Sequence, residues 1–363
     1  MLISGVLVPR YDNDMGKLNN MKALMKKDRA PGAELVDIDI PEIGPKDVLV
    51  KVKAAAICGT DVHIYDWTPY AQARIKPPMI FGHETCGEIV SVGNQVTNFK
   101  PGDLVAVETH IPCEECYQCQ TGAQHICEKM AIIGVHTNGT FAEYAKIPAV
   151  CCWKLPKDTN PDLGAILEPW GVAVNGILKG EVNNRSVAVF GCGPIGLLGL
   201  GSIAAWGATR IFAVEPIPTR LNMVPKFAPD ATLINPTKED AVKAILKATG
   251  GRGVDVSIEI SGNTQAAKMA FQVLRRGGRV SLVGLPSAPV ELDFPEDIIY
   301  KEAKVFGSTG RLMWQTWWDM QNLLESGKFD PMPVITHRFP LAEFKNALEL
   351  AKSGEAGKIL LYP

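Results

Sequence analysis

Four cysteines within fifteen residues, in the pattern Cys113-x2-Cys116-x2-Cys119-x7-Cys127, constrain the folding of this chain most strongly. Gaps of two residues let a turn present successive thiolates to one metal ion, and a fourth ligand completes a tetrahedral zinc shell. Because four thiolates leave no open coordination position, this zinc would be structural. The alternatives, a disulfide cluster or scattered core thiols, do not account for the ligand spacing. The pattern therefore predicts a structural zinc lobe over residues 110–130.

The size and charge of the chain limit the classes of protein to which it can belong. A length of 363 residues suffices for two domains, and 46% hydrophobic with 21% charged residues is typical of a globular protein. The formal net charge is -2, and no apolar run reaches the roughly 18 residues of a membrane span. Nucleic acids and membranes are therefore not expected partners. Nine cysteines without a recognisable signal peptide favour a reducing, cytoplasmic environment.

The sequence pattern changes near residue 172. Residues 21–171 are rich in short β-branched runs separated by glycine and proline, which favours a β-rich barrel or sandwich. Over residues 172–311 strands alternate with helices, the pattern of a parallel α/β sheet. We expect the tail, residues 312–363, to return to the β-rich domain, and residues 1–20 to form an appendage. The strands expected in the α/β domain are Ser186–Phe190, Arg210–Glu215, Val254–Ile260, Arg279–Gly284 and Lys304–Gly307.

A glycine-rich turn follows the first of these strands. Gly191-Cys-Gly193-Pro-Ile-Gly196 lies between a predicted strand and an apolar helix, the setting in which such a motif binds a dinucleotide. Gly191 permits the tight turn, Gly193 lets a pyrophosphate approach the backbone, and Gly196 lets helix and strand pack closely. The helix N-terminus then faces the phosphates. The cofactor contacts expected here are Gly191, Gly193, Pro194, Ile195 and Gly196.

Two charged residues after the second strand bear on the choice of cofactor. Glu215 lies 19 residues after Gly196 and would accept hydrogen bonds from the adenosine ribose while repelling a 2′-phosphate. NAD is therefore favoured over NADP. Arg220 lies five residues further on and weakens this exclusion, because a cation can reach a 2′-phosphate. Pro225 and Pro229 interrupt the helix that is expected to follow.

Four residues outside the lobe can also bind a metal ion. Cys58, His83 and Glu84 lie in the β-rich half, and Glu168 lies near the boundary between the two domains. A thiolate, an imidazole and a carboxylate together can hold zinc and leave room for a substrate oxygen, as catalytic sites do. Taken singly, each residue has an ordinary structural explanation, since a lone cysteine is usually core and a glutamate before proline is usually solvated.

Several motifs in their chain order resemble the zinc-containing medium-chain alcohol dehydrogenases over nearly all of residues 21–363. They are Cys58-Gly-Thr, Gly82-His-Glu-x2-Gly87-x5-Gly93-x2-Val96, the cysteine lobe and the glycine turn. The resemblance implies a GroES-like catalytic domain (21–171 and 312–363), a Rossmann NAD-binding domain (172–311) and an active site between them. It implies two zinc ions in each subunit and a homotetramer, or at least a dimer. The catalytic zinc would be held by Cys58, His83, Glu84 and Glu168.

The same resemblance suggests roles for residues around the reacting alcohol. Residues matching Thr60 and His63 relay the alcohol proton outward in the family, and the residue matching His110 lies by the substrate. Each histidine can equally be a satisfied structural residue. Arg311, in Gly307-Ser-Thr-Gly-Arg311, is grouped with the cofactor-binding residues.

The substrate class stays open between two branches of the family. Segments such as Ile57–Trp67 resemble the threonine dehydrogenases, and His110 and Arg311 suit a charged amino acid. Val172 and Asn175, which follow Glu168-Pro-Trp-Gly, look more like the polyol and cyclitol branches, and both are expected near the substrate. A non-catalytic NAD-binding scaffold is a remote alternative that would be expected to lack parts of the zinc shell. The expected reaction is NAD-dependent oxidation of a secondary alcohol on a small polar substrate.

Overall fold

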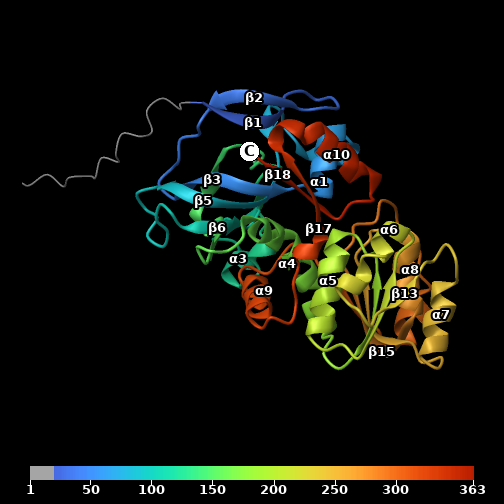
Figure 1. The fold of residues 1–363 in the computed structure, drawn as a ribbon. Helices are drawn as coiled ribbons and strands as arrows, with labels where there is room; N and C mark the ends of the chain where they lie inside the picture. The colour runs from blue at the N-terminus through green and yellow to red at the C-terminus, as the bar shows by residue number, and fades with distance from the viewer. Residues whose placement is uncertain (1–19) are drawn as a thin grey trace, which may run out of the picture.

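The computed structural model describes residues 20–363, so nearly all of the predicted appendage lies outside the described residues. One half of the protein is β-rich and the other is an α/β layer structure (Figure 1). This arrangement confirms the predicted fold class. In the described part of the chain, no helix is both long and apolar enough to cross a membrane.

The β-rich half is organised around the long strand β3 (Asp47–Ala56). It pairs with β5 (Glu84–Val92) and β9 (Tyr144–Pro148) because alternate residues such as Val48, Val50 and Val52 point into a buried core. The remaining strands of residues 20–160 are β1 (Asn20–Lys26), β2 (Glu34–Asp39), β4 (Met79–Ile80), β6 (Leu104–Val107), β7 (His110–Ile111), β8 (Ala131–Ile132) and β10 (Cys152–Leu155).

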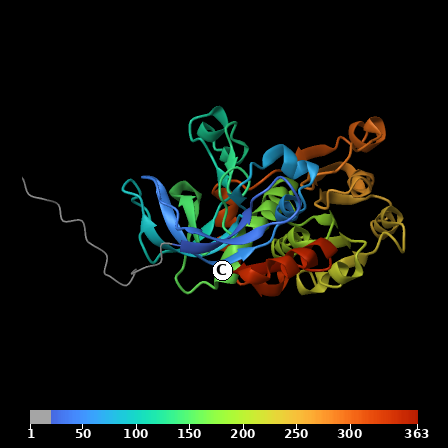
Figure 2. The same cartoon turned by 90° about the horizontal axis from the view of Figure 1, so that it is seen from above.

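The last residues of the chain complete the sheet of the β-rich half. β18 (Lys358–Tyr362) pairs antiparallel with the end of β3 and parallel with β17 (Ile335–Pro340). The helix α10 (Phe344–Ser353) connects these two strands and contributes Phe344 and Leu348 to the same core. The C-terminus therefore lies beside strands that are formed some 300 residues earlier (Figures 1 and 2).

The α/β half contains a six-stranded parallel sheet with the strand order β13-β12-β11-β14-β15-β16. The order reverses between β11 and β14, and ligands of open α/β sheets bind at the carboxyl ends of the strands at such a point. The strands are β11 (Ser186–Phe190), β12 (Arg210–Val214), β13 (Thr232–Ile234), β14 (Val254–Glu259), β15 (Leu274–Leu282) and β16 (Lys304–Gly307); the helices are α5 (Pro194–Ala205), α6 (Pro218–Leu221), α7 (Ala241–Ala248) and α8 (Thr264–Gln272).

Helix α4 (Pro161–Gly180) joins the two halves. One continuous core runs from Ala54 and Cys86 of the β-rich sheet through Trp170 of α4 to Val189 of β11. Helix α9 (Gln315–Glu325) packs against α4 and adds Trp317 to the same core. Because α4 is shared by both halves, its residues Glu168 to Val172 can face a cavity between them.

The element boundaries differ in detail from the sequence predictions. The strand expected over Arg279–Gly284 is the second part of a longer strand, since residues 274–282 form β15 with a bulge against β14. The helix expected after β12 is interrupted as predicted: α6 is short and a separate 3-10 turn covers Val224–Lys226. The two prolines there each remove a backbone donor, which stops a regular helix.

Candidate functional site

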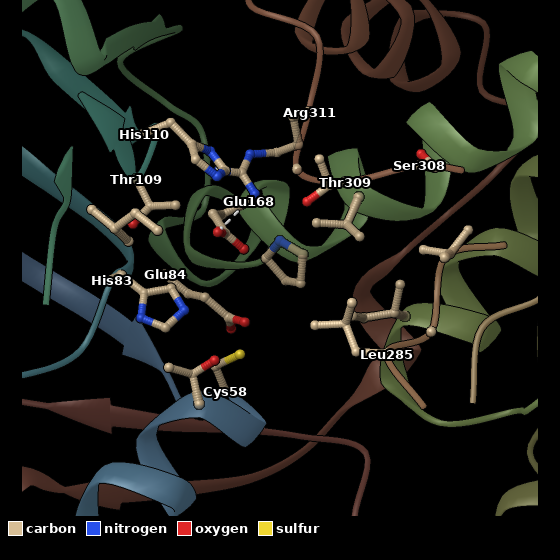
Figure 3. A pocket seen from close by; sticks show the side chains of 18 of the residues that line it. Cys58, His83, Glu84, Thr109, His110, Glu168, Leu285, Ser308, Thr309 and Arg311 are labelled. Atoms are coloured by element: carbon tan, nitrogen blue, oxygen red, sulfur yellow. Dashed lines mark hydrogen bonds and ion pairs between the residues drawn. The ribbon is translucent and has the colours of Figure 1, made fainter. Parts of the chain in front are cut away.

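A cavity of about 370 Å³ lies between the β-rich half, α4 and the carboxyl ends of the parallel strands (Figure 3). All three parts of the fold contribute to its walls. Its lining residues include Cys58, Thr60, Tyr70, His83, Glu84, Thr109, His110, Ile132, Glu168, Val172, Ile195, Ser261, Leu285, Thr309 and Arg311.

Cys58, His83 and Glu84 form one cluster in the wall of this cavity. One ligand atom from each lies within 4.8 Å of the others, which suits a shared metal ion. Cys58 is the N-cap of α1 (Gly59–Asp66), and Glu84 opens β5, so two element ends bring the three side chains together. Figure 3 shows all three side chains on the same side of the pocket.

Asp61 orients this cluster from α1, a role that the sequence analysis missed. Its Oδ2 accepts a hydrogen bond from the backbone N–H of Cys58 at 2.8 Å. Its Oδ1 lies 3.7 Å from Nδ1 of His83, and neither atom has a hydrogen-bond partner among residues 20–363. Burial disfavours a charged imidazole, but Asp61 and Cys58 raise the pKa of His83 to about 10. Nδ1 of His83 faces Asp61, so Nε2 is the nitrogen that can bind a metal ion once it has released its proton.

Glu84 is held by Lys358, the first residue of β18. Nζ of Lys358 donates to both carboxylate oxygens and, at 3.1 Å, to the carbonyl oxygen of Ile57. Burial raises the pKa of Glu84 to about 7, with Lys358 opposing that rise. The ammonium group of Lys358 therefore sits directly behind the metal-binding cluster, on the strand that closes the sheet.

Glu168 does not join the other three predicted ligands in this structure. Its Oε1 forms an ion pair with Nη1 of Arg311 at 2.8 Å, and both side chains are buried. The other guanidinium nitrogens of Arg311 bind the buried Glu108. Glu168 still lines the cavity, so it lies near the cluster without belonging to it.

Two of the expected site residues make contacts that the sequence did not indicate. Arg311, grouped with the cofactor contacts, lies in the pocket wall and pairs there with the buried carboxylates of Glu108 and Glu168. Asn175 was expected near the substrate, but it does not line the cavity. Its Nδ2 donates to the carbonyl oxygens of Thr309 and Gly310, both at 3.1 Å, and therefore fastens α4 to that loop.

The remaining predicted pocket residues lie as follows. Val172 and His110 line the cavity, as does Thr60 on α1. His63 lies one turn further along α1, is exposed, and has its Nδ1 3.2 Å from Oγ1 of Thr68. Its ring packs against Tyr70, which lines the cavity. Thr60 and His63 thus share one face of α1, running from the cavity to solvent.

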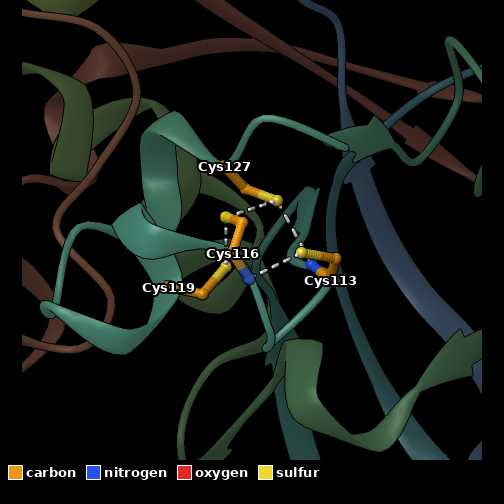
Figure 4. Close-up of side chains that lie close together, drawn as sticks. All are labelled: Cys113, Cys116, Cys119 and Cys127. Carbon is orange, nitrogen blue, oxygen red and sulfur yellow. Dashed lines mark hydrogen bonds between the residues drawn. The ribbon is translucent and has the colours of Figure 1, made fainter.

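The four cysteines of the lobe converge on one point (Figure 4). Sγ of Cys116 lies 3.5 Å from Sγ of Cys119 and 3.8 Å from Sγ of Cys127. A tetrahedron with zinc–sulfur bonds of about 2.3 Å requires sulfur–sulfur distances of about 3.8 Å, so the spacing fits zinc and not a disulfide. Backbone N–H groups of Cys119 and Glu128 lower the pKa of the Cys116 thiol to about 6. Such a thiolate suits metal binding.

The glycine turn has the geometry that a dinucleotide requires. Gly191 has a φ of 105°, which a side chain disfavours, and a Cβ on Gly196 would lie 2.1 Å from the carbonyl oxygen of Gly191. Gly193 faces open space, because a Cβ there would meet only Nη1 of Arg220, at 3.7 Å. Pro194 opens α5, and Ile195 reaches the cavity.

Glu215 and Arg220 flank this turn. Glu215 is buried, and its carboxylate accepts hydrogen bonds from the backbone N–H groups of Cys192 at 2.7 Å and Ile217 at 3.0 Å. Its negative charge therefore lies directly beneath the turn. Nε of Arg220 donates to the carbonyl oxygen of Gly354, which holds the guanidinium at the edge of the same turn.

Known protein families match both halves of the chain. Residues 44–157 match the alcohol dehydrogenase GroES-like domain, and residues 194–326 match the zinc-binding dehydrogenase domain. An L-threonine 3-dehydrogenase from Bacillus licheniformis is 45% identical over 344 residues, covering 95% of this chain and 99% of the relative. Another from Pyrococcus abyssi is 46% identical over 341 residues, covering 94% and 98%.

Solved structures agree with this similarity. The 2R,3R-butanediol dehydrogenase from Bacillus subtilis has a TM-score of 0.85 at 31% identity, covering 94% of this chain and 99% of that one. An alcohol dehydrogenase from Escherichia coli in complex with NADH has a TM-score of 0.86 at 28% identity, covering 95% and 100%.

Proposed function

Because the chain belongs to the zinc-binding alcohol dehydrogenase family, we propose that it oxidises the secondary hydroxyl group of L-threonine with NAD as the hydride acceptor. The observation that carries this choice of substrate is the similarity over nearly the whole chain to two L-threonine 3-dehydrogenases from distant organisms. The cavity supports it, because a candidate metal cluster and the end of the glycine turn open onto the same space.

The proposed zinc site consists of Cys58, His83 and Glu84, with Glu168 as a neighbouring carboxylate. When bound, zinc lowers the pKa of the substrate hydroxyl group, and NAD accepts the hydride. The carboxylate of Asp61, 3.7 Å from Nδ1 of His83, would favour a proton on Nδ1 and so leave Nε2 for the zinc ion. Lys358 balances the charge of Glu84, so a buried carboxylate can remain beside the cluster.

We assign the movement of the hydroxyl proton to Thr60 and His63. Oγ1 of Thr60 would take the proton inside the cavity, since Thr60 lines it. His63 follows one turn later on α1 and is exposed, so it would pass the proton to solvent. Positioned proton transfer of this kind contributes about 10² to 10⁴-fold to a rate.

NAD is proposed over NADP on electrostatic grounds. The buried carboxylate of Glu215 lies under the glycine turn and would repel a 2′-phosphate. Arg220 would attract one, but its guanidinium is partly engaged by Gly354. We therefore expect kcat/KM to be higher with NAD than with NADP, with some activity remaining with NADP.

A polyol or cyclitol is the second candidate substrate. The charge of Arg311 is balanced by Glu108 and Glu168, so this residue offers no free cation for the carboxylate of an amino acid. Val172 adds an apolar side chain to the wall of the same cavity. Both observations favour a neutral, hydroxyl-bearing substrate.

NADH production by the zinc-loaded protein separates these candidates. The substrates would be L-threonine, 2,3-butanediol, sugar alcohols and inositols, each with NAD and with NADP. Selective turnover of L-threonine supports the proposal. Turnover of a polyol with threonine inert would replace it by the second candidate on the same chemistry.

We also propose a homo-oligomer and a cytoplasmic location. β16 is the edge of the parallel sheet, and large apolar side chains lie exposed beside it: Leu285, Phe294, Ile299, Tyr300 and Val305. An uncovered edge strand of this kind pairs readily with another chain. All nine cysteines are free, as a reducing compartment requires. Light scattering of the purified protein, with Val305→Lys for comparison, tests the assembly.

A further inference from the structure

We propose that Glu108 is a positioning residue for the reaction, because it fixes His110 and Arg311 in the pocket wall beside the metal-binding cluster. The proposal rests on the proposed function above. Glu108 follows β6 and does not line the cavity; the segment Glu108-Thr-His110 resembles the threonine dehydrogenases, but the sequence assigned no role to Glu108 itself.

The carboxylate of Glu108 is fully buried and takes part in five hydrogen bonds. Oε1 accepts from the backbone N–H of His110 at 2.9 Å and from Nη2 of Arg311, and it lies 2.7 Å from Nδ1 of His110. Oε2 accepts from Nε of Arg311 at 2.8 Å and from Nε1 of Trp317 at 3.0 Å. These donors come from three separate segments of the chain, so the carboxylate has no freedom to rotate.

The charge of Glu108 is fixed as well as its position. Burial alone would raise its pKa, but Arg311 and His110 hold the pKa of Glu108 well below its usual range. An ionised carboxylate can only accept hydrogen bonds. Glu108 is therefore a permanent acceptor at neutral pH.

Glu108 and Arg311 together hold the ring of His110. Nδ1 lies 2.7 Å from Oε1 of Glu108, which only accepts, and 2.8 Å from Nη2 of Arg311, which only donates, so both contacts engage Nδ1 and Nε2 is the nitrogen left for a ligand in the cavity. The ring is also confined by Gly310, where a Cβ would lie 2.8 Å from its Cε1 atom. His110 thus presents one defined atom to a substrate.

The carboxylate of Glu108 also limits the ion pair between Arg311 and Glu168. Two guanidinium nitrogens bind Glu108, and only Nη1 reaches Glu168, at 2.8 Å. If Glu108 lost its charge, the whole guanidinium would be attracted to Glu168. The carboxylate of Glu168 would then take a different position in the wall of the cavity.

The bonds of Glu108 also connect parts of the chain that build the pocket. His110 opens the two-stranded sheet β7–β8 at the base of the cysteine lobe, Arg311 follows β16, and Trp317 belongs to α9. Figure 3 shows His110, Arg311 and Glu168 side by side at the cavity. A change at Glu108 would therefore displace both His110 and Arg311 in the wall of the cavity.

A purely structural role is the competing explanation, since removing one partner of a buried ion pair destabilises a protein. Asp255 offers a control of similar chemistry, although its pair with Arg275 is only partly buried. Its carboxylate accepts from the backbone N–H and the hydroxyl of Ser186, at 2.8 and 2.7 Å, and from Nε of Arg275 at 2.6 Å. This pair lies in the α/β half and does not line the cavity.

The experiment compares Glu108→Gln, Glu108→Asp and Asp255→Asn in the zinc-loaded protein. It measures kcat and KM for the alcohol that the wild type oxidises, KM for NAD, and the nitrogen-15 NMR signals of the histidine imidazoles. Assignment uses His110→Asn. We expect kcat/KM for the alcohol to fall about 10²-fold in Glu108→Gln and about tenfold in Glu108→Asp, because small misplacements of positioned groups have effects of this size.

The KM for NAD should stay unchanged in these variants, and the ring-nitrogen signals of His110 should shift. Asp255→Asn should lower the melting temperature and leave kcat/KM and the His110 signal as in the wild type. If Glu108→Gln does not fold, the test rests on Glu108→Asp, which keeps the negative charge and shortens the side chain. Wild-type kcat/KM with an unmoved His110 signal in the folded Glu108 variants would overturn the proposal. A wild type that oxidises none of the alcohols would refute the proposed function, while the NMR signals would still test the positioning of His110.

Discussion

The four cysteines of the lobe come from fifteen consecutive residues, whereas Cys58, His83 and Glu84 come from a helix start, a loop and a strand start in the β-rich half. The lobe ligands are all thiolates, and backbone N–H groups of the same short segment donate to them: that of Cys113 to Sγ of Cys127, and that of Cys116 to Sγ of Cys113. The second cluster mixes ligand types and depends on Asp61 and Lys358.

This difference separates a site that stabilises a segment from a site that can do chemistry. A closed shell of four thiolates needs only local chain geometry and has no position for a substrate. The mixed cluster borders a cavity, and the charges that surround it are paired with residues from distant parts of the chain. The lobe should therefore govern stability and the mixed cluster should govern turnover.

The largest effect is expected from Cys58→Ala. Turnover should fall more than about 10³-fold, because a catalytic zinc contributes several kcal/mol to transition-state stabilisation. Zinc analysis should show the loss of one equivalent while the fold is retained by circular dichroism. Cys86→Ala is the matched control, because Cys86 is a buried cysteine outside both clusters. Wild-type turnover after confirmed loss of this zinc would refute the assignment.

Replacing the counter-ion of Glu84 tests the long-range support of the mixed cluster. Lys358→Met leaves the buried carboxylate of Glu84 without its partner, so we expect a loss of about 3–5 kcal/mol in the free energy of unfolding. Lys352→Met removes a more exposed lysine that pairs with Asp66 and should cost about 1 kcal/mol or less. Urea unfolding measures both. Equal losses of unfolding free energy in the two variants would show that the buried Lys358–Glu84 pair stabilises the protein no more than the more exposed Lys352–Asp66 pair.

Cys116→Ser tests whether the cysteine lobe governs stability and not turnover. We expect the melting temperature to fall by about 5 °C or more, because a structural zinc contributes its binding energy to folding. The kcat of the molecules that remain folded should change little. Calorimetry and active-site-normalised kinetics measure the two quantities. A large fall in kcat with unchanged melting temperature would reverse the roles of the two clusters.

The smallest effect is expected at the glycine turn. Glu215→Ala removes the carboxylate beneath it and should shift the ratio of kcat/KM for NAD over NADP by about tenfold toward NADP, which corresponds to about 1.4 kcal/mol. Arg220→Ala should shift the ratio in the opposite direction. An unchanged ratio in both variants would mean that neither charge contributes to cofactor choice.

Features encoded in neighbouring residues could be predicted from the sequence. The cysteine lobe and the glycine turn each lie within one short segment, so their spacing reports their geometry. Asp61 could have been found in the same way, because it occupies the third helical position after the N-cap Cys58. The hydrogen bonds of Asn175 could not be predicted, because it lies one turn from Val172 on α4 and spacing does not reveal which of the two lines the cavity and which binds a backbone loop.

Contacts between distant residues could not be predicted. Lys358 lies 274 residues from Glu84, and Arg311 lies 203 residues from Glu108. A lysine at the start of an apolar strand and an arginine after a glycine carry no local sign of their partners. These buried charges become understandable only when the folded chain brings the carboxylates beside them.

X-ray diffraction at the zinc absorption edge tests the central comparison most directly. Crystals of the zinc-loaded protein should show two anomalous peaks in each chain, one among the four cysteines of the lobe and one bound by Cys58 and His83 at the cavity. A single peak at the lobe, with no metal at Cys58 and His83 under saturating zinc, would contradict the account.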